Sequence, residues 1–314
     1  MISSILGQVT GQLEKRFVLN ALFPALAFAI ALGLAAAAGV DGVPAALDSW
    51  EDQDAAVKVV LVVGAVAAVF LGANLLATGM QSIIGLFEGY VPPVSWLGPW
   101  ARNRHLERVE RLVEQEGDSE DPKKSSEAAD SLQRRYPPTP RPLASDDLAP
   151  TRLGNLLRSA EKYPVERYGV DTVRAWPRLS PLLPESLTTE IAQARASMEF
   201  LLAVSFLAGV YAPLAAVFMI AAAAPLPWTL AALIGGSAIA IAAYFAALGP
   251  ASIYADLVRS AFDLHRLKLI AAMGKPMPAT LSEERRTWRQ LIRFLERGEP
   301  KKHADWRYAF SEKK

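Results

Sequence analysis

The residues that could carry chemistry gather between positions 152 and 176. This polar cluster supplies the candidate ligand- or partner-binding residues, which are Arg152, Asn155, Arg167, Tyr168, Asp171, Arg174 and Trp176, together with Glu88 upstream. Charged and aromatic groups at this density could bind a ligand or a partner protein, but structural ion-pair networks concentrate the same residue types. We favour the structural interpretation, in which the ion pairs of the cluster hold a compact cytoplasmic cap against the membrane helices.

Other reactive constellations are missing from the sequence. The chain has no cysteine, and His105, His265 and His303 stand apart without the spacing of metal ligands. There is no glycine-rich phosphate loop, no serine nucleophile elbow and no pair of catalytic carboxylates. We therefore expect no catalytic residue, no metal, no cofactor and no nucleic-acid partner.

Four long apolar stretches flank the polar cluster and determine the predicted architecture of the chain. They run over Phe17–Ala38, Ala56–Thr78, Glu199–Ala222 and Trp228–Leu248. Each is long enough, at about 1.5 Å per helical residue, to cross a hydrocarbon layer of about 30 Å. Lys58 and Glu199 are charged, but both lie at span ends, where long side chains reach the interface. The sequence predicts an all-α, polytopic membrane protein with four transmembrane helices.

The distribution of basic residues predicts the orientation. The segment 40–55 between the first two spans carries five acidic residues and no basic one. Nearly all Lys and Arg residues lie in the N-terminus, between spans two and three, and after span four. The positive-inside bias then places both termini and the central region in the cytoplasm. We expect a multi-pass protein of a bacterial inner (cell) membrane.

The chain is expected to divide into five parts. These are an interfacial amphipathic helix (1–16), spans one and two (17–78), a cytoplasmic region (79–197) with a flexible loop (116–150), spans three and four (198–248), and a cytoplasmic helical tail (249–314). The first helix could equally pack on the protein's own cytoplasmic part. The loop is predicted from its acidic, Ser- and Pro-rich composition, which buries little apolar area.

Local signals predict the helices of the cytoplasmic region. A charged helix covers Arg102–Gln115. Thr151 caps a helix that should stop near Tyr163, because Pro164 follows. Asp171 caps a second, shorter helix. Two tail helices cover Ala251–Met273 and Leu281–Arg297, the latter with Thr280 and Glu283 as a capping box and with an apolar face that includes Trp288 and Leu291.

Two surfaces of the predicted helices could bind lipid or a second copy. Small residues recur every four positions in three spans, including Gly64, Ala68 and Gly72 in the second and Ala232, Gly236 and Ala240 in the fourth. Such rows favour a homo-oligomer, or close packing within one four-helix unit. The last helix carries a row of arginines that either binds lipid headgroups or is simply solvated: Arg286, Arg289, Arg293 and Arg297. Asn74 could line a pore, although a hydrogen bond to a neighbouring helix is the favoured role.

Several short segments resemble a known family. They are Leu86–Tyr90, Thr151–Asn155, Ala160–Pro164, Arg167–Asp171, Trp176–Leu179 and Ala261–Arg266. In these segments the chain resembles uncharacterised four-span integral membrane proteins from high-GC Gram-positive bacteria. The resemblance supports the topology and implies no activity. The order of two spans, a helical region, two spans and a tail is also similar to that of bestrophin-type channels, an analogy at the level of topology alone.

Three functions follow from these features, in decreasing order of preference. The first is a membrane anchor or scaffold without enzymatic activity, which binds a cytoplasmic protein or its own copies. The second is a homo-oligomeric passive channel, since the spans lack ionisable groups at mid-depth. The third is a membrane-embedded lipid-modifying enzyme acting through Arg167 and Asp171.

Overall fold

The computed structural model describes residues 17–40, 42–92, 96, 98–118, 121–138 and 145–297. Within these ranges every regular element is a helix, which confirms the predicted all-α fold. The chain divides into two compact units. The apolar unit comprises Met1–Leu86 and Ala196–Pro250, and the polar unit comprises Phe87–Arg195 and Ala251–Lys314. The predicted interfacial helix 1–16 lies outside the described residues.

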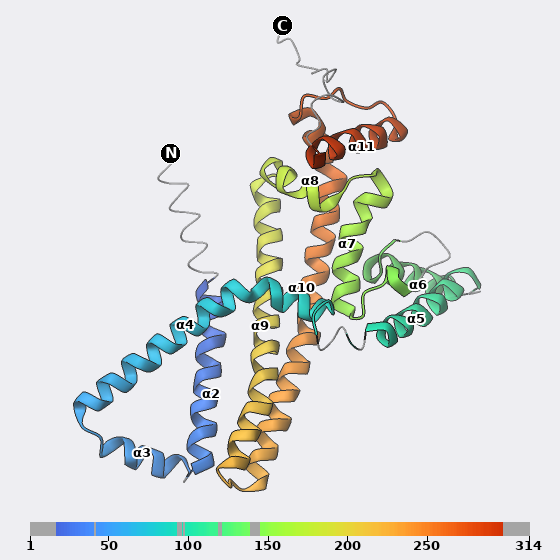
Figure 1. Cartoon of the computed structure of the whole chain (residues 1–314). Coiled ribbons are helices and arrows are strands. Elements are labelled where there is room, and N and C mark those ends of the chain that lie inside the picture. The colour runs from blue at the N-terminus through green and yellow to red at the C-terminus, as the bar shows by residue number, and fades with distance from the viewer. Residues whose placement is uncertain are drawn as a thin grey trace. The chain divides into compact units, whose positions relative to one another are not determined.

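The described residues include four helices that are long and apolar enough to cross a membrane, as predicted. They are Val18–Gly39 (the π-helical turn η1, Val18–Leu22, and α2, Phe23–Val40), Ala55–Glu88 (α4), Glu185–Ala221 (α9) and Leu226–Ala272 (α10) (Figure 1). A short helix, α3 (Val43–Glu51), links the first two. The chain is therefore a multi-pass membrane protein.

Within the apolar unit, α9 and α10 pack closely along their small residues. A Cβ atom added to Gly236 of α10 would lie 2.9 Å from the Cβ of Ala212 on α9. The buried hydroxyl of Ser205 donates a hydrogen bond of 2.8 Å to the carbonyl of Ala240. The side-chain amide of Asn20 donates to the carbonyl of Ala196 at 3.0 Å and so ties the start of the first span to α9. The small-residue row of α10 thus serves packing within the unit.

Helix α4 makes few contacts within the apolar unit. In its most apolar stretch 11% of the residues are buried, compared with 33% in α9. Val60 and Leu71 are 70% and 62% exposed. Gly64 and Gly72 have open space where a Cβ atom would lie. Within the described part of the chain, no other helix therefore comes within 4 Å of a Cβ atom added at either glycine.

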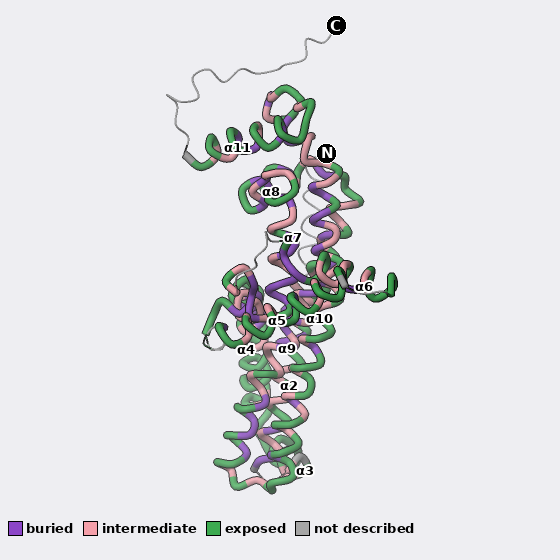
Figure 2. Tube along the Cα trace, turned by 90° about the vertical axis from the view of Figure 1, so that its right-hand side faces the viewer, coloured by how far each residue is buried: buried purple, intermediate pink, exposed green. Residues whose placement is uncertain are grey.

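The polar unit is built from shorter helices and from the ends of α4, α9 and α10. Its remaining helices are α5 (Gly98–Asp118), α6 (Pro122–Arg135), α7 (Arg152–Tyr168), α8 (Thr172–Leu179) and α11 (Leu281–Arg297), with 3-10 turns η3 (Ser145–Asp147) and η4 (Ser180–Leu182). Much of α7 is buried (Figure 2). The apolar stripe of α5 packs against Leu132, Tyr136 and Leu148.

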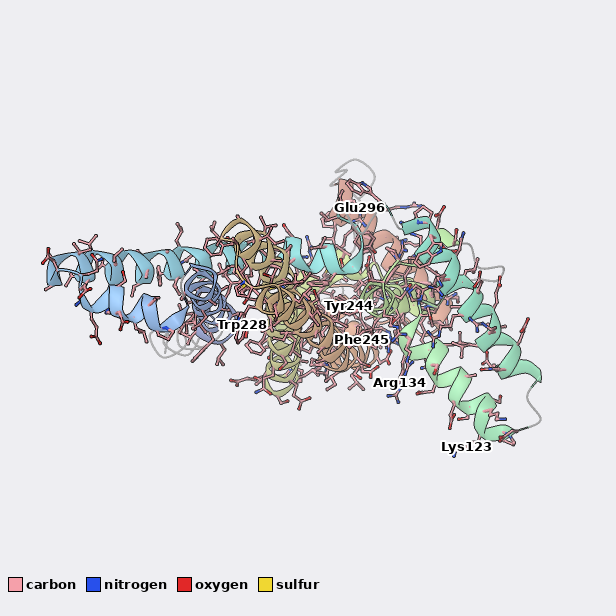
Figure 3. All side chains as sticks on the ribbon, turned by 90° about the horizontal axis from the view of Figure 1, so that it is seen from below. Lys123, Arg134, Trp228, Tyr244, Phe245 and Glu296 are labelled. Atoms are coloured by element: carbon pink, nitrogen blue, oxygen red, sulfur yellow. The ribbon has the colours of Figure 1, made fainter. Side chains whose placement is uncertain are left out.

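The prediction of a flexible loop over 116–150 is wrong for a large part of that segment. Helix α5 continues through Asp118, and α6 follows, with Lys123 and Arg134 near its two ends (Figure 3). The Asp121 side chain caps α6 by accepting a hydrogen bond from the Lys123 amide, and Pro122 occupies the first turn. These local start signals outweigh the low apolar content of the segment.

Two helices run further than expected, through a proline. Helix α7 continues for one more turn beyond Pro164, where it was expected to stop. Helix α10 runs through Pro250 and joins the fourth span to the first tail helix, which were expected to be separate. The end of α7 comes at Gly169, whose φ of +73° suits glycine. There the amides of Gly169 and Val170 bond back to the carbonyls of Val165 and Pro164. The extra turn brings Tyr168 into the same helix as Tyr163.

Candidate functional site

The N-terminal end of α7 is fixed by a buried asparagine. Asn155 is 1% exposed, and its carboxamide accepts a hydrogen bond from the Ala149 amide and donates one to the Ala149 carbonyl, both at 2.8 Å. It also donates to the Thr151 carbonyl at 3.0 Å. The Thr151 hydroxyl accepts from the Gly154 amide at 2.9 Å, which confirms the predicted cap. Asn155 thus fixes the segment before α7, and all three hydrogen bonds of its side chain go to backbone atoms of that segment.

The end of α4 lies directly against this turn. A Cβ atom on Gly154 would lie 2.5 Å from the backbone oxygen of Glu88, a distance that no side chain tolerates. Glu88 is the last residue of α4 and is half-buried. The structure therefore brings Glu88 and Asn155, two residues of the predicted site, to the same end of α7. Arg152 is exposed at that end.

The C-terminal end of α7 meets α10 through one carboxylate. Asp263 accepts hydrogen bonds from the hydroxyls of Tyr163, at 3.0 Å, and of Tyr168, at 2.7 Å. Burial raises the pKa of Tyr168 to about 12, with a further contribution from the Asp263 hydrogen bond and charge. Arg167 donates to the Tyr163 hydroxyl at 3.0 Å. Both tyrosines are therefore held as neutral donors to Asp263.

A second carboxylate joins α10 to α11. Glu284, which is 5% exposed, accepts hydrogen bonds from Arg266 Nε at 2.7 Å and Nη2 at 3.3 Å. The indole of the buried Trp288 donates to the same carboxylate at 3.2 Å. The Arg266 guanidinium also lies 3.6 Å from the centre of the Tyr168 ring, a cation–π contact that links the two carboxylate clusters.

Helix α8 is held to α11 by an ion pair. Asp171 caps α8 by accepting a hydrogen bond from the Arg174 amide at 2.9 Å, as predicted. The Arg174 guanidinium pairs with Asp171 and, at 2.6 Å, with Glu296 of α11. The Trp176 ring packs against Phe262, with 6.0 Å between the ring centres.

The predicted cluster thus separates into two contact sites at opposite ends of α7. Sequence reasoning identified Asn155, whose partners are local, and Tyr168 and Arg174, but did not assign the tail partners of the last two, which are Asp263 and Glu296. Asp263 and Arg266 lie on the polar side of the predicted helix Ala251–Met273. That polar side was the only feature of the sequence that could have identified them as partners. None of these contacts pairs a nucleophile with a general base.

An open groove lies beside this network. It has a volume of about 920 Å³ and is bounded by α5, α6 with the residues after it, α7 and α11. Its apolar surface comes from Val109, Val113, Leu132 and Tyr136, and its charged residues are Glu110, Glu116, Glu166, Arg167 and Arg285. Arg285 donates hydrogen bonds to the carbonyls of Glu166 and Arg167, at 2.9 and 3.0 Å. Both groove arginines therefore already have acceptors within the chain.

Burial perturbs a histidine next to the groove. His105 Nδ1 lies 3.2 Å from the hydroxyl of Tyr136, which lines the groove. Burial lowers the pKa of His105 below its ordinary value, and the positive charges of Arg152 and Arg108 lower it further. The neutral imidazole is the form that the folded polar unit favours.

The remaining predicted site residues lie elsewhere. Arg286, Arg289 and Arg293 are exposed on α11, and the side chain of Arg297 lies outside the described residues. Headgroup binding by this row stays a prediction. The side-chain amide of Asn74 donates to the Phe70 carbonyl of its own helix at 2.8 Å. A role for Asn74 in a pore or in a bond to a neighbouring helix stays a prediction.

Among the described residues there is no group of three or more His, Asp or Glu side chains placed to hold a metal ion. No protein-family model matches this sequence, and no curated protein or solved structure is similar to it.

Proposed function

We propose that this membrane protein is a non-enzymatic anchor or scaffold whose polar unit holds a peptide segment of a cytoplasmic protein. The observation that carries the proposal is the groove of about 920 Å³ between α5, α6, α7 and α11. Its size is within the range of about 300–1,000 Å³ that ligand-binding clefts occupy. The groove combines apolar and charged side chains, as protein–protein interfaces do.

The charges favour one class of segment. Among the described lining residues, three are acidic and two are arginines that already donate to acceptors of their own chain: Arg285 to two backbone carbonyls, Arg167 to the Tyr163 hydroxyl. The side chains of Glu110 and Glu166 are exposed. A complementary segment carries apolar side chains for Val109 and Val113 and Lys or Arg for the acidic residues of the groove. An enzyme acting through Arg167 and Asp171 gains no support, since both side chains are engaged by neighbours within the chain.

Site-specific photo-crosslinking tests the anchor function in cells that express the protein at its natural level. A photoreactive amino acid at Gln133, which lines the groove, should give a discrete adduct with one protein. The same amino acid at Glu127, exposed on α6 and outside the groove, is the matched control and should give none. Sequencing of the adduct should reveal an apolar segment with Lys or Arg.

Charge reversal on the groove tests the recognition chemistry. The double variant Glu110→Lys, Glu166→Lys should lower the adduct yield about fivefold or more, because each reversal replaces attraction by repulsion. Glu114→Lys, on the same helix as Glu110 but outside the groove, should leave the yield unchanged. An adduct that is equally abundant at Gln133 and Glu127, or that contains an acidic segment, would contradict the proposal.

We place the polar unit and both termini in the cytoplasm of a bacterial cell, on the basis of the basic residues. The chain has no cysteine, so single introduced thiols report location without background. Glu127→Cys in the polar unit should resist a membrane-impermeant maleimide added to intact cells. Ser49→Cys, exposed in α3 between the first two spans, should react. The reverse pattern would invert the topology.

We further propose that the chain forms a homo-oligomer through α4. The support is the low burial of α4 in its own unit and the open space beside Gly64 and Gly72. Leucine at both glycines should convert a cross-linked oligomer in native membranes to monomer, because close helix approach needs small residues. Gly33→Leu, an exposed position on α2 with equally open space, is the control. A ring with measurable conductance would favour the passive channel, and a non-conducting dimer the scaffold.

A further inference from the structure

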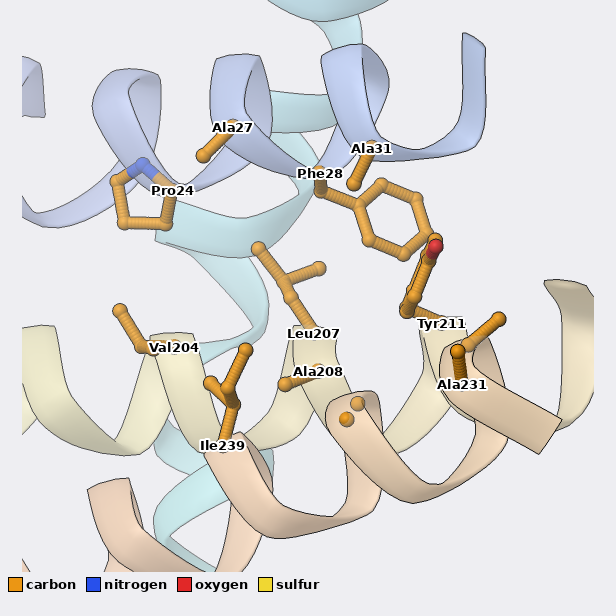
Figure 4. A pocket seen from close by; sticks show the side chains of 13 residues that line it. Pro24, Ala27, Phe28, Ala31, Val204, Leu207, Ala208, Tyr211, Ala231 and Ile239 are labelled. Atoms are coloured by element: carbon orange, nitrogen blue, oxygen red, sulfur yellow. The ribbon is translucent and has the colours of Figure 1, made fainter. Parts of the chain in front are cut away.

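We infer that a groove between α2, α9 and α10 in the apolar unit is a binding site for one acyl chain of a bilayer phospholipid. This site is separate from the partner groove of the polar unit and does not depend on the function proposed for it. The groove has a volume of about 370 Å³. Figure 4 shows Phe28 of α2, Leu207 and Tyr211 of α9, and Ile239 of α10 around it.

The lining selects hydrocarbon. Among the lining residues that the structure describes, none is charged and only Tyr211 has a polar side-chain group. A ligand with a polar group in this position would lose its hydrogen bonds to water and regain few of them. The helices that form the walls span a membrane, so phospholipid acyl chains are the hydrocarbon that meets the opening.

The groove is held open by the packing of its walls. Gly236 is closed against α9, since an added Cβ atom would lie 2.9 Å from the Ala212 Cβ and 3.2 Å from its Cα. Gly235, the preceding residue, lines the groove, and a Cβ atom added there would meet nothing within 4 Å. Helices α9 and α10 are already in contact along Gly236, so they cannot approach further to fill the space beside Gly235.

The groove is short. Along α2 it extends from Pro24 to Ala31, which is about 10 Å at a rise of 1.5 Å per residue. A second copy that seated a helix in the groove is distinguished by the labelling experiment, because it would give adducts between copies.

Photo-labelling with a phospholipid tests this site. The purified full-length protein is reconstituted in phosphatidylethanolamine–phosphatidylglycerol vesicles that contain a phospholipid with a diazirine in one acyl chain. After illumination, adducts are mapped by peptide mass spectrometry. Adducts should concentrate on the groove-facing residues of α2, α9 and α10. They should be sparse on α4, although Val60 and Leu71 are exposed to the same bilayer.

Two variants give the decisive comparison. Gly235→Leu should fill the groove and lower its labelling about tenfold, the effect of roughly 1.4 kcal/mol in binding free energy. Gly33→Leu, which adds the same side chain at an open position outside the groove, should not change the labelling. If Gly235→Leu fails to insert, Ala31→Leu fills the groove from the opposite wall. Labelling spread evenly over all exposed spans of the unmodified protein, or adducts that join two copies at the groove, would overturn the inference.

Discussion

The hydroxyl of Tyr168 lies 2.7 Å from Oδ1 of Asp263, a residue 95 positions further along the chain. The same carboxylate accepts from Tyr163, and Arg266 lies over the Tyr168 ring. One aspartate of α10 thus fixes the last turn of α7, and through Arg266 and Glu284 it is linked to α11. This chain of charge-assisted hydrogen bonds adds to the apolar core of the polar unit, which includes the buried Leu153, Phe262 and Trp288.

Tyr168→Phe should destabilise the polar unit by about 1–2 kcal/mol, because it removes a hydrogen bond to a charged acceptor and keeps the ring. The loss should be visible as a lower midpoint of thermal unfolding in detergent. Tyr211→Phe, which removes a hydroxyl from the apolar unit, serves as the control and should leave the polar unit unaffected. An unchanged midpoint for Tyr168→Phe would show that water replaces the bond at no cost.

A pH dependence should accompany this bond. Tyr168 has its pKa raised from the ordinary value of 10.0 to about 12, so the folded protein keeps the phenol protonated where the unfolded chain has lost the proton. The stabilisation is complete below pH 10 and is lost as the pH rises from 10 to about 12. Tyr168→Phe should flatten that part of a plot of unfolding midpoint against pH.

Asn155→Ala should cost about 2–3 kcal/mol, because it leaves the amide and carbonyl of Ala149 buried without partners. Asn155→Asp is the informative companion. Aspartate can still accept from the Ala149 amide, but it cannot donate to the carbonyls of Ala149 and Thr151. Both variants should lower the denaturation midpoint of the polar unit, and wild-type stability for either would refute the structural role of Asn155.

Local features of the polar unit could be predicted from the sequence, whereas its long-range contacts could not. The caps at Thr151 and Asp171 were predictable because each acts on an amide three residues away. The burial of Trp288 and Leu291 followed from their spacing on one face of a helix. The bond between Tyr168 and Asp263 was not predictable, since nothing local to either residue identifies a partner 95 positions away.

Composition misled the prediction for 116–150. The segment is polar and Pro-rich, and it was expected to be a flexible loop, yet Asp121 and Pro122 are ordinary signals for the start of a helix. At Pro164 and Pro250 the sequence predicted a break between helices, and the structure has a continuous helix. A proline removes one amide donor, and a helix anchored by packing on both sides of it can tolerate that loss, although an isolated helix would not. Tertiary contacts of α7 and α10 outweigh this local preference.

His105 should make the stability of the polar unit fall in mild acid. Its pKa is lowered by burial and by two arginines, so below the ordinary value of 6.5 the unfolded chain gains a proton that the folded unit does not bind. Stability is therefore unaffected above pH 6.5 and decreases as the pH falls below it. His105→Gln should make this decrease between pH 7 and pH 5.5 smaller, as measured by thermal unfolding, and His265, whose pKa burial also lowers, accounts for the part that stays. A steeper decrease in the variant would contradict the assignment.

Gly236→Ala should destabilise the apolar unit, although alanine favours helices. The helix preference alone would stabilise by about 1 kcal/mol. Against it, the new methyl group would lie 2.9 Å from the Ala212 Cβ and 3.2 Å from its backbone Cα, so α9 and α10 must move apart. Overpacking of this kind costs about 1–3 kcal/mol. Gly33→Ala separates the two effects, because its methyl group meets nothing within 4 Å. Thermal unfolding in detergent should show a lower midpoint for Gly236→Ala and an equal or higher one for Gly33→Ala; two equal shifts would mean that α9 and α10 separate without cost.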